Sequence, residues 1–171
     1  MKPFVLWMTG LPCSGKTTIV KDLQKDIPNL AMLDGDELRE WFSPKDFSKA
    51  GRDEHNNKVA HLAKLLLNHG VPSVVSLISP YIENRESARK IIDAGEQFAE
   101  CFVKCSIEKC EERDVKGMYA KARKGEIKGF TGIDDPYEAP EHPDLVIDTE
   151  HDSLLDSANK VKDFLNGRNL L

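Results

Sequence analysis

The chain has 171 residues, a length that suits one compact domain with a single hydrophobic core. Its formal net charge is −5, whereas proteins that grip the nucleic-acid backbone are usually basic or carry a basic stripe. No apolar run approaches the length of about 20 residues that a membrane span requires, and no secretory signal is evident. We therefore expect a cytoplasmic protein that binds neither nucleic acid nor membrane.

Strand-like and helix-like patterns alternate along the chain. The continuous apolar run Phe4–Met8 predicts a first strand that is buried on both faces, and the helix that follows runs from Gly15 to about Lys25, before Pro28. This alternation predicts an α/β fold of three layers, with a mostly parallel sheet and helices on both of its faces. Further strands are expected at Leu30–Leu33, Ser73–Ile78, Phe98–Cys105 and Leu145–Ile147. Further helices are expected at Asp53–His69, at Glu83–Ala94, in a short stretch after Cys105 that ends at Glu112, and from the Ser153 cap to about Leu165.

The segment 116–140 departs from this alternation. It mixes glycine and proline with lysine and arginine and has no long hydrophobic period. Long irregular segments in compact domains are usually lids or binding loops. We therefore expect residues 116–140 to form a partly helical lid over a site within one domain that spans residues 1–171.

A phosphate-binding loop of the pattern GxxxxGK[ST] occupies Gly10–Thr17, between the first strand and the first helix. Its glycines let the backbone N–H groups point at phosphate oxygens, Lys16 adds a positive charge, and Thr17 offers a hydroxyl to Mg²⁺. An ATPase or a GTPase would also fit the loop, but the guanine-reading Asn-Lys-x-Asp is absent. The pattern favours a small-molecule kinase of the P-loop type, with ATP bound by Gly10, Cys13, Ser14, Gly15, Lys16, Thr17 and Thr18.

Two carboxylates stand one residue apart where the second strand is expected to end. Asp34 is suited to ordering Mg²⁺, and Asp36 to orienting an attacking hydroxyl or accepting its proton. Arg39 lies one helical turn further on and could hold a phosphate of the acceptor. The alternative is an aspartate that caps a helix, followed by a surface arginine.

Several motifs resemble the adenylylsulfate (APS) kinases. They are LDGD at Leu33–Asp36, ISPY at Ile78–Tyr81, CEERD at Cys110–Asp114 and above all KGMYAKARKGEIKGFTGIDDPYEAPEHP at Lys116–Pro143. The resemblance covers nearly the whole chain. It implies transfer of the γ-phosphate of ATP to the 3′-hydroxyl of adenosine 5′-phosphosulfate, which gives PAPS in sulfate assimilation.

The same resemblance implies roles for individual residues and a homodimeric enzyme. Lys16, Asp36 and Ser79 would be catalytic, and Thr17 and Asp34 would hold Mg²⁺. Without the resemblance, a phenylalanine is more often a core residue and a loop lysine is more often simply solvated. The implied binding site for the small acceptor nucleotide consists of Asp36, Arg39, Phe47, Arg52, His55, Ile78, Ser79, Lys128 and Phe130.

Three positions depart from the family pattern, all on the acceptor side. His55 stands where the family has asparagine, and Asn57 and Ile82 each replace an arginine. Because one charge-assisted contact is worth about 1.5–3 kcal/mol, such changes can alter the preferred substrate. The alternative acceptor is a related nucleotide such as cytidine diphosphoramidate, which belongs to surface-polysaccharide pathways. A nucleotide-binding module without catalysis is a third alternative, which the intact Lys16 and Asp36 disfavour.

Overall fold

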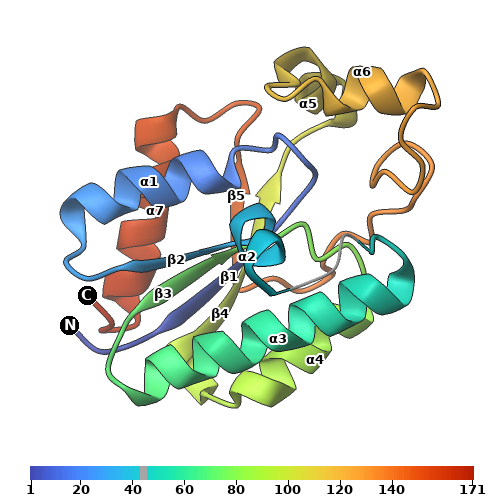
Figure 1. Cartoon of the computed structure of the whole chain (residues 1–171). Helices are drawn as coiled ribbons and strands as arrows, with labels where there is room; N and C mark the ends of the chain where they lie inside the picture. The colour runs from blue at the N-terminus through green and yellow to red at the C-terminus, as the bar shows by residue number, and fades with distance from the viewer. Residues whose placement is uncertain (43–45) are drawn as a thin grey trace.

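A single sheet forms the centre of the computed structural model, which describes residues 1–42 and 46–171 (Figure 1). Within these residues five strands pair in the order β2-β3-β1-β4-β5, and every pairing is parallel. All five residues of β1 are buried, as its continuous apolar run predicts. The strands are β1 (Val5–Thr9), β2 (Ala31–Asp34), β3 (Ser73–Ser76), β4 (Phe98–Lys104) and β5 (Leu145–Asp148).

Helices cover both faces of the sheet, so the predicted three-layer α/β fold is confirmed (Figure 1). On one face α1 (Lys16–Asp26) and α7 (Leu154–Gly167) pack together over a core that includes Leu6 and Met8. On the other face α3 (Lys49–Asn68) and α4 (Ile82–Ile92) enclose a second core around Trp7. The alternation of side chains along β1 explains why one strand supplies both cores.

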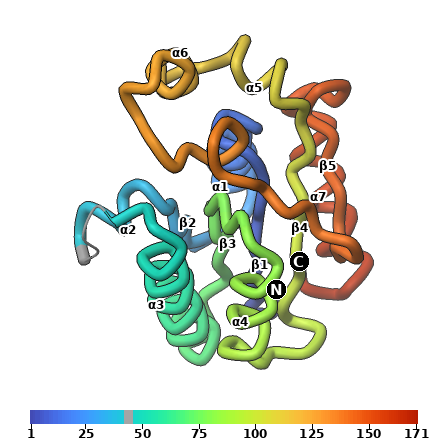
Figure 2. The backbone as a smooth tube through the Cα atoms, turned by 90° about the vertical axis from the view of Figure 1, so that its right-hand side faces the viewer, coloured from blue at the N-terminus to red at the C-terminus, as the bar shows by residue number. Residues whose placement is uncertain are grey.

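The remaining elements lie around the carboxyl ends of the strands. They are α2 (Gly35–Phe42), α5 (Ile107–Arg113) and α6 (Met118–Arg123). A 3₁₀ turn at Gly95–Gln97 lies elsewhere, directly before the start of β4. Figure 2 shows the chain passing from α5 through α6 and returning as a long irregular loop towards β5. None of the described helices is long and apolar enough to cross a membrane.

Two helices differ from the sequence prediction for identifiable reasons. The sequence indicated the helix α2 without bounds, through the helical turn to Arg39 and the capping alternative; it begins directly after Asp34, whose Oδ1 accepts hydrogen bonds from the backbone N–H groups of Asp36 and Glu37 at 3.0 and 3.4 Å. The helix α3 begins at Lys49 rather than Asp53, because Ser48 caps it by accepting a hydrogen bond from Gly51 N. In both cases a side-chain oxygen satisfies N–H groups that would otherwise lack partners.

A buried arginine joins the loop after β3 to the end of the 116–140 segment. Arg85 on α4 has a side chain that is only 3% exposed, and its Nε donates to Glu100 Oε1 on β4 at 2.7 Å. Its Nη1 and Nη2 donate to the carbonyl oxygens of Ser79 and Glu138, both at 2.7 Å. Nearby, Glu138 N donates to Pro80 O at 2.8 Å. The carboxyl-terminal end of the 116–140 segment is therefore fastened to β4 and to the loop after β3.

We expect the substitution Arg85→Met to lower the free energy of unfolding by about 3–5 kcal/mol, because it removes the nearer cation, at 2.7 Å, from the largely buried Glu100 carboxylate and leaves only Arg89 at 4.0 Å. Urea denaturation measures this change. The control is Lys160→Met, which removes a more exposed ion pair with Asp152 and should cost less than about 1 kcal/mol. A loss for Arg85→Met no larger than that of the control would contradict the structural role of Arg85.

Candidate active site

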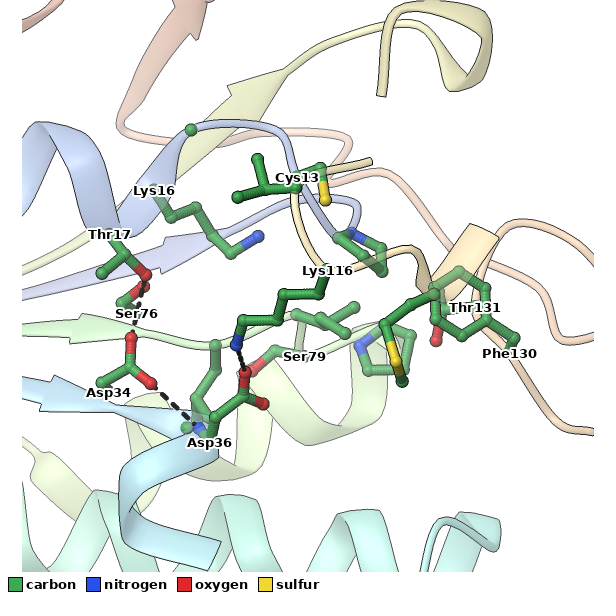
Figure 3. A pocket seen from close by; sticks show the side chains of 18 of the residues that line it. Cys13, Lys16, Thr17, Asp34, Asp36, Ser76, Ser79, Lys116, Phe130 and Thr131 are labelled. Atoms are coloured by element: carbon green, nitrogen blue, oxygen red, sulfur yellow. Dashed lines mark hydrogen bonds and ion pairs between the residues drawn. The ribbon is translucent and has the colours of Figure 1, made fainter. Parts of the chain in front are cut away.

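A cavity of about 620 Å³ opens at the carboxyl ends of the strands. The phosphate loop, the start of α2, the amino-terminal half of α3, the loop after β3 and the 116–140 segment all contribute to its lining (Figure 3). Ligands of open parallel sheets bind at this edge, where neighbouring strands connect to helices on opposite faces. The cavity is also large enough for a nucleotide-sized ligand.

The phosphate loop has the backbone that its glycines predict. A Cβ atom on Gly10 would lie 2.4 Å from Val103 O, so only glycine fits this close approach. Gly15 and Cys13 adopt positive φ angles of 101° and 62°, and the Cys13 side chain is partly exposed. The loop thus curls as a phosphate cradle requires.

Lys16 folds back onto this loop. Its Nζ donates to Gly10 O and Leu11 O, both at 2.8 Å, and to Ser14 Oγ at 3.2 Å. Burial lowers the pKa of Lys16 from its usual 10.5 to about 8. Phosphate oxygens in the cradle would give the buried Lys16 ammonium group a negatively charged partner in place of these neutral oxygens.

Three side-chain oxygens meet beside Lys16. Thr17 Oγ1 donates to Asp34 Oδ2 at 2.8 Å and lies 3.1 Å from Ser76 Oγ (Figure 3). Carboxylate and hydroxyl oxygens with nearby phosphates are the ligands that Mg²⁺ prefers, so these residues fit that ion. Ser76 was not predicted, although the parallel register places it directly opposite Asp34. Asp34 also caps α2, so the helix-cap interpretation is correct for this residue.

Asp36 points into the cavity from the first turn of α2. Its Oδ2 forms an ion pair with Lys116 Nζ at 2.6 Å, although the two residues are 80 positions apart (Figure 3). Arg39 does not contact this pair. Its guanidinium lies 4.8 Å from the centre of the Phe47 ring and donates to Asp46 O at 3.1 Å. Burial first, and the nearby charge of Arg52 second, lower the pKa of Arg39.

Arg52 connects the backbone of Phe47 to the residues on either side of Phe130, and the family resemblance assigns both phenylalanines to the acceptor site. It is 6% exposed, and its Nε donates to Phe47 O at 2.8 Å. Its Nη1 donates to Thr131 Oγ1 at 2.7 Å and its Nη2 to Gly129 O at 2.6 Å, on either side of Phe130. Phe47 is 51% exposed, whereas Phe130 packs edge-to-face against Tyr119 at 4.9 Å between ring centres.

Ser79, Ile78 and Lys128 also line the cavity. The Ser79 hydroxyl is buried, accepts from Trp7 Nε1 at 3.1 Å and donates to Asn56 Oδ1 at 3.3 Å. Ile78 is half-buried, while Lys128 is exposed. These contacts give the Ser79 hydroxyl a clear structural role beneath the acceptor side of the cavity.

Of the three departures from the family pattern, only His55 lines the cavity. It is 2% exposed, and burial together with the charge of Arg39 lowers its pKa to about 4. Asn57 Oδ1 instead accepts from Ser87 Oγ on α4 at 3.0 Å. Ile82 begins α4, and its backbone N–H donates to Glu138 Oε2 at 2.7 Å. Two of the three changes therefore lie in packing contacts between elements.

The opposite side of the cavity holds residues that the sequence analysis did not assign. Arg113 Nη1 donates to Cys13 O at 3.4 Å and Nη2 to Thr149 O at 2.5 Å. Thr149 Oγ1 donates to Ser14 O at 2.7 Å. These residues follow β4 and β5, whereas Asp34 and Ser76 end β2 and β3, on the other side of β1. The phosphate loop therefore lies between two ends of one cavity.

A parallel sheet with a phosphate loop after its central strand, and two carboxylates at the end of the edge strand β2, defines a P-loop kinase fold. A family model described as adenylylsulphate kinase matches residues 2–148. The adenylyl-sulfate kinase of Staphylococcus epidermidis is 43% identical, with 96% of this chain and 84% of that protein covered. That of Thermodesulfovibrio yellowstonii is 44% identical over 94% and 82%. The chain belongs to the adenylylsulphate kinase family.

Solved structures agree with this assignment. The APS kinase of Mycobacterium tuberculosis, determined in complex with AMPPNP and APS, is 40% identical and superposes with a TM-score of 0.89. The alignment covers 96% of this chain and 98% of that one. A gluconokinase from Sinorhizobium meliloti, 15% identical with a TM-score of 0.65, shares the fold alone.

We expect the stability of the protein to fall as pH decreases from about 6.5 to 4. In this range the unfolded chain protonates His55 while the folded chain, with a pKa of about 4, does not, so the unfolded state binds more protons. Urea unfolding at several pH values should show a weaker fall for His55→Asn, by up to about 1.4 kcal/mol per pH unit. The exposed His61→Asn on the same helix is the control, and identical pH profiles for wild type and His55→Asn would contradict the prediction.

Proposed function

We propose that the chain transfers the γ-phosphate of ATP to the 3′-hydroxyl of APS and releases ADP and PAPS. The observation that carries the proposal is that the phosphate loop and Asp36 face one another in one cavity, in a chain of the adenylylsulphate kinase family. The 40% identity to an enzyme described with AMPPNP and APS supports the same pair of substrates.

ATP binds with its phosphates in the cradle of the phosphate loop. Lys16 exchanges its carbonyl partners for phosphate oxygens, which are stronger acceptors because they are charged. Thr17, Asp34 and Ser76 would hold Mg²⁺, which supplies charge neutralisation between the phosphates. The far end of the cavity, at Arg113 and Thr149, is left for the adenine of ATP.

The acceptor nucleotide occupies the end of the cavity near α3. Its base lies between Phe47 and Phe130, because a flat base stacks on aromatic rings. Arg39 leaves the Phe47 face and turns to the acidic group of the acceptor. Arg52 keeps its backbone partners and so holds the two rings at a fixed separation.

Transfer is direct and in line. The acceptor hydroxyl attacks the γ-phosphorus, the bond to the β,γ-bridging oxygen breaks, and the hydroxyl proton passes to Asp36. Asp36 is exposed to the cavity from the rigid first turn of α2, so its carboxylate can reach the acceptor. Lys16 stabilises the charge that develops on the phosphoryl oxygens. Catalysis therefore derives mainly from positioning and charge stabilisation.

A cytidine nucleotide such as cytidine diphosphoramidate is the second candidate acceptor. The observation that favours it is His55, which changes the lining itself from the asparagine of the family pattern. Asn57 and Ile82 contribute less to this alternative than their lost charges suggest, because they contact α4 and Glu138. The family resemblance also favours a cytoplasmic homodimer, which sedimentation and cell fractionation would test.

We expect purified protein with Mg²⁺ and ATP to release ADP and form PAPS when APS is added, and to show little turnover with cytidine nucleotides. Lys16→Met should lower kcat by about 10²–10³-fold because it removes a charge that stabilises the transition state. Lys124→Ala, an exposed change outside the cavity lining, is the control. Turnover with cytidine diphosphoramidate and little with APS would instead identify the second candidate.

Asp36→Asn should lower kcat by about 10²–10⁴-fold while the KM for APS changes much less, because the amide cannot accept the proton. Steady-state kinetics with varied APS separate the two parameters. A variant with the wild-type kcat would remove Asp36 from the mechanism.

A further inference from the structure

Lys116 is presented to the cavity by a well-anchored turn. Asp114, just before it, accepts hydrogen bonds from Tyr119 N and Ala120 N at 3.0 Å each and so holds the start of α6. Gly117 N donates to Asp114 O at 2.8 Å, which closes the turn around Lys116. Tyr119 OH donates to Pro12 O at 3.0 Å. The backbone that carries Lys116 is therefore fixed to the phosphate loop.

The side chain of Lys116 crosses the cavity towards Asp36. Figure 3 shows it reaching across towards Asp36, below Lys16 in this view, and its Nζ lies 2.6 Å from Asp36 Oδ2. The side chains of the pair are 66% and 76% exposed, and exposed ion pairs contribute little to the stability of a fold. The pair matters for the chemistry instead, because Lys116 binds the carboxylate that accepts the proton of the acceptor hydroxyl.

Water is a competing acceptor in this reaction. Attack by water would form a bond from its oxygen to the γ-phosphorus, break the bond to the β,γ-bridging oxygen, and pass a proton to Asp36. The products would be ADP and inorganic phosphate. An ammonium group has three N–H donors and no acceptor atom, so Lys116 takes up an Asp36 lone pair without being able to accept a proton.

We propose that Lys116 determines specificity for the nucleotide acceptor over water, by holding the Asp36 carboxylate until an acceptor hydroxyl replaces it. This inference rests on the proposed kinase function. An acceptor nucleotide arrives with the binding free energy of its base and its acidic group, and part of that free energy displaces Lys116. A single water molecule brings no such contacts, so it does not displace the amine.

The first test measures ADP release with Mg²⁺ and ATP in the absence of any acceptor. Lys116→Met should raise this hydrolysis about two- to fivefold, the factor expected for losing one exposed ion pair. Lys116→Arg keeps the charge and should raise hydrolysis less than Lys116→Met does. The double variant Lys116→Met/Asp36→Asn should fall back to the wild-type rate or below, because the released carboxylate is then missing. Lys124→Ala, exposed and outside the cavity lining, is the matched loss of a lysine.

The second test examines the ion pair without turnover. The hydrogen bond to Asp36 raises the pKa of Lys116, so in the ligand-free protein Asp36→Asn should increase labelling of Lys116 by an amine-reactive reagent. Labelling of Lys124 on the same protein, read by mass spectrometry, should stay constant. Unchanged labelling of Lys116 would overturn the proposal because the pair would then not form in solution.

Three kinetic outcomes would also overturn it. The first is acceptor-free hydrolysis by Lys116→Met at the wild-type rate. The second is a rate below the wild type, which would make Lys116 an aid to phosphoryl transfer. The third is an equal rise when Asp36→Asn is also present, which would indicate a loosened 116–140 segment. Transfer to APS is measured on the same samples, because wild-type protein that forms no PAPS would refute the proposed function itself.

Discussion

The hydroxyl of Thr17 is the point on which the site depends, since it joins the first turn of α1 to the ends of two strands. It donates to Asp34 at 2.8 Å and lies 3.1 Å from Ser76. These contacts exist because β2 and β3 pair in parallel with Asp34 opposite Ser76, and β3 pairs with β1. Parallel register thus converts separate strand ends into one oxygen-lined corner beside the phosphate loop. Asp34 in turn positions Asp36, because its other carboxylate oxygen caps α2.

Three cations of the cavity, Lys16, Arg39 and Lys116, have partners within the protein. Lys16 lies on carbonyl oxygens of its own loop, Arg39 lies over Phe47, and Lys116 lies on Asp36. When a substrate binds, these three cations therefore exchange protein partners for substrate groups. They are not fully hydrated before binding. Such exchanges cost part of the binding free energy, and they also keep each cation near the place where it is needed. His55, buried and neutral at physiological pH, adds no further charge to this end of the cavity.

The parts of the fold and site that follow from the sequence are those encoded by local patterns. The apolar run of β1 and the glycines of the phosphate loop define short-range geometry, and both are confirmed by the structure. Contacts between distant segments leave no such pattern. Ser76 is an ordinary serine until the strand register places it by Asp34, and Lys116 is 80 residues from Asp36. The bounds of α2 escaped prediction because its eight residues are too few for a clear period and its cap, Asp34, lies within the motif assigned to Mg²⁺ and the acceptor.

The anchoring of the 116–140 segment limits how it can change shape. Tyr119 fastens its beginning to Pro12, and Arg85 fastens its end through Glu138. Between these points Gly125 lies exposed, with a positive φ of 74° and open space around it. The stretch around Gly125 is consequently a place where the polypeptide tolerates being lengthened, since neither attachment runs through it. An inserted reporter group at that position would lie outside the cavity lining while both attachments stayed in place.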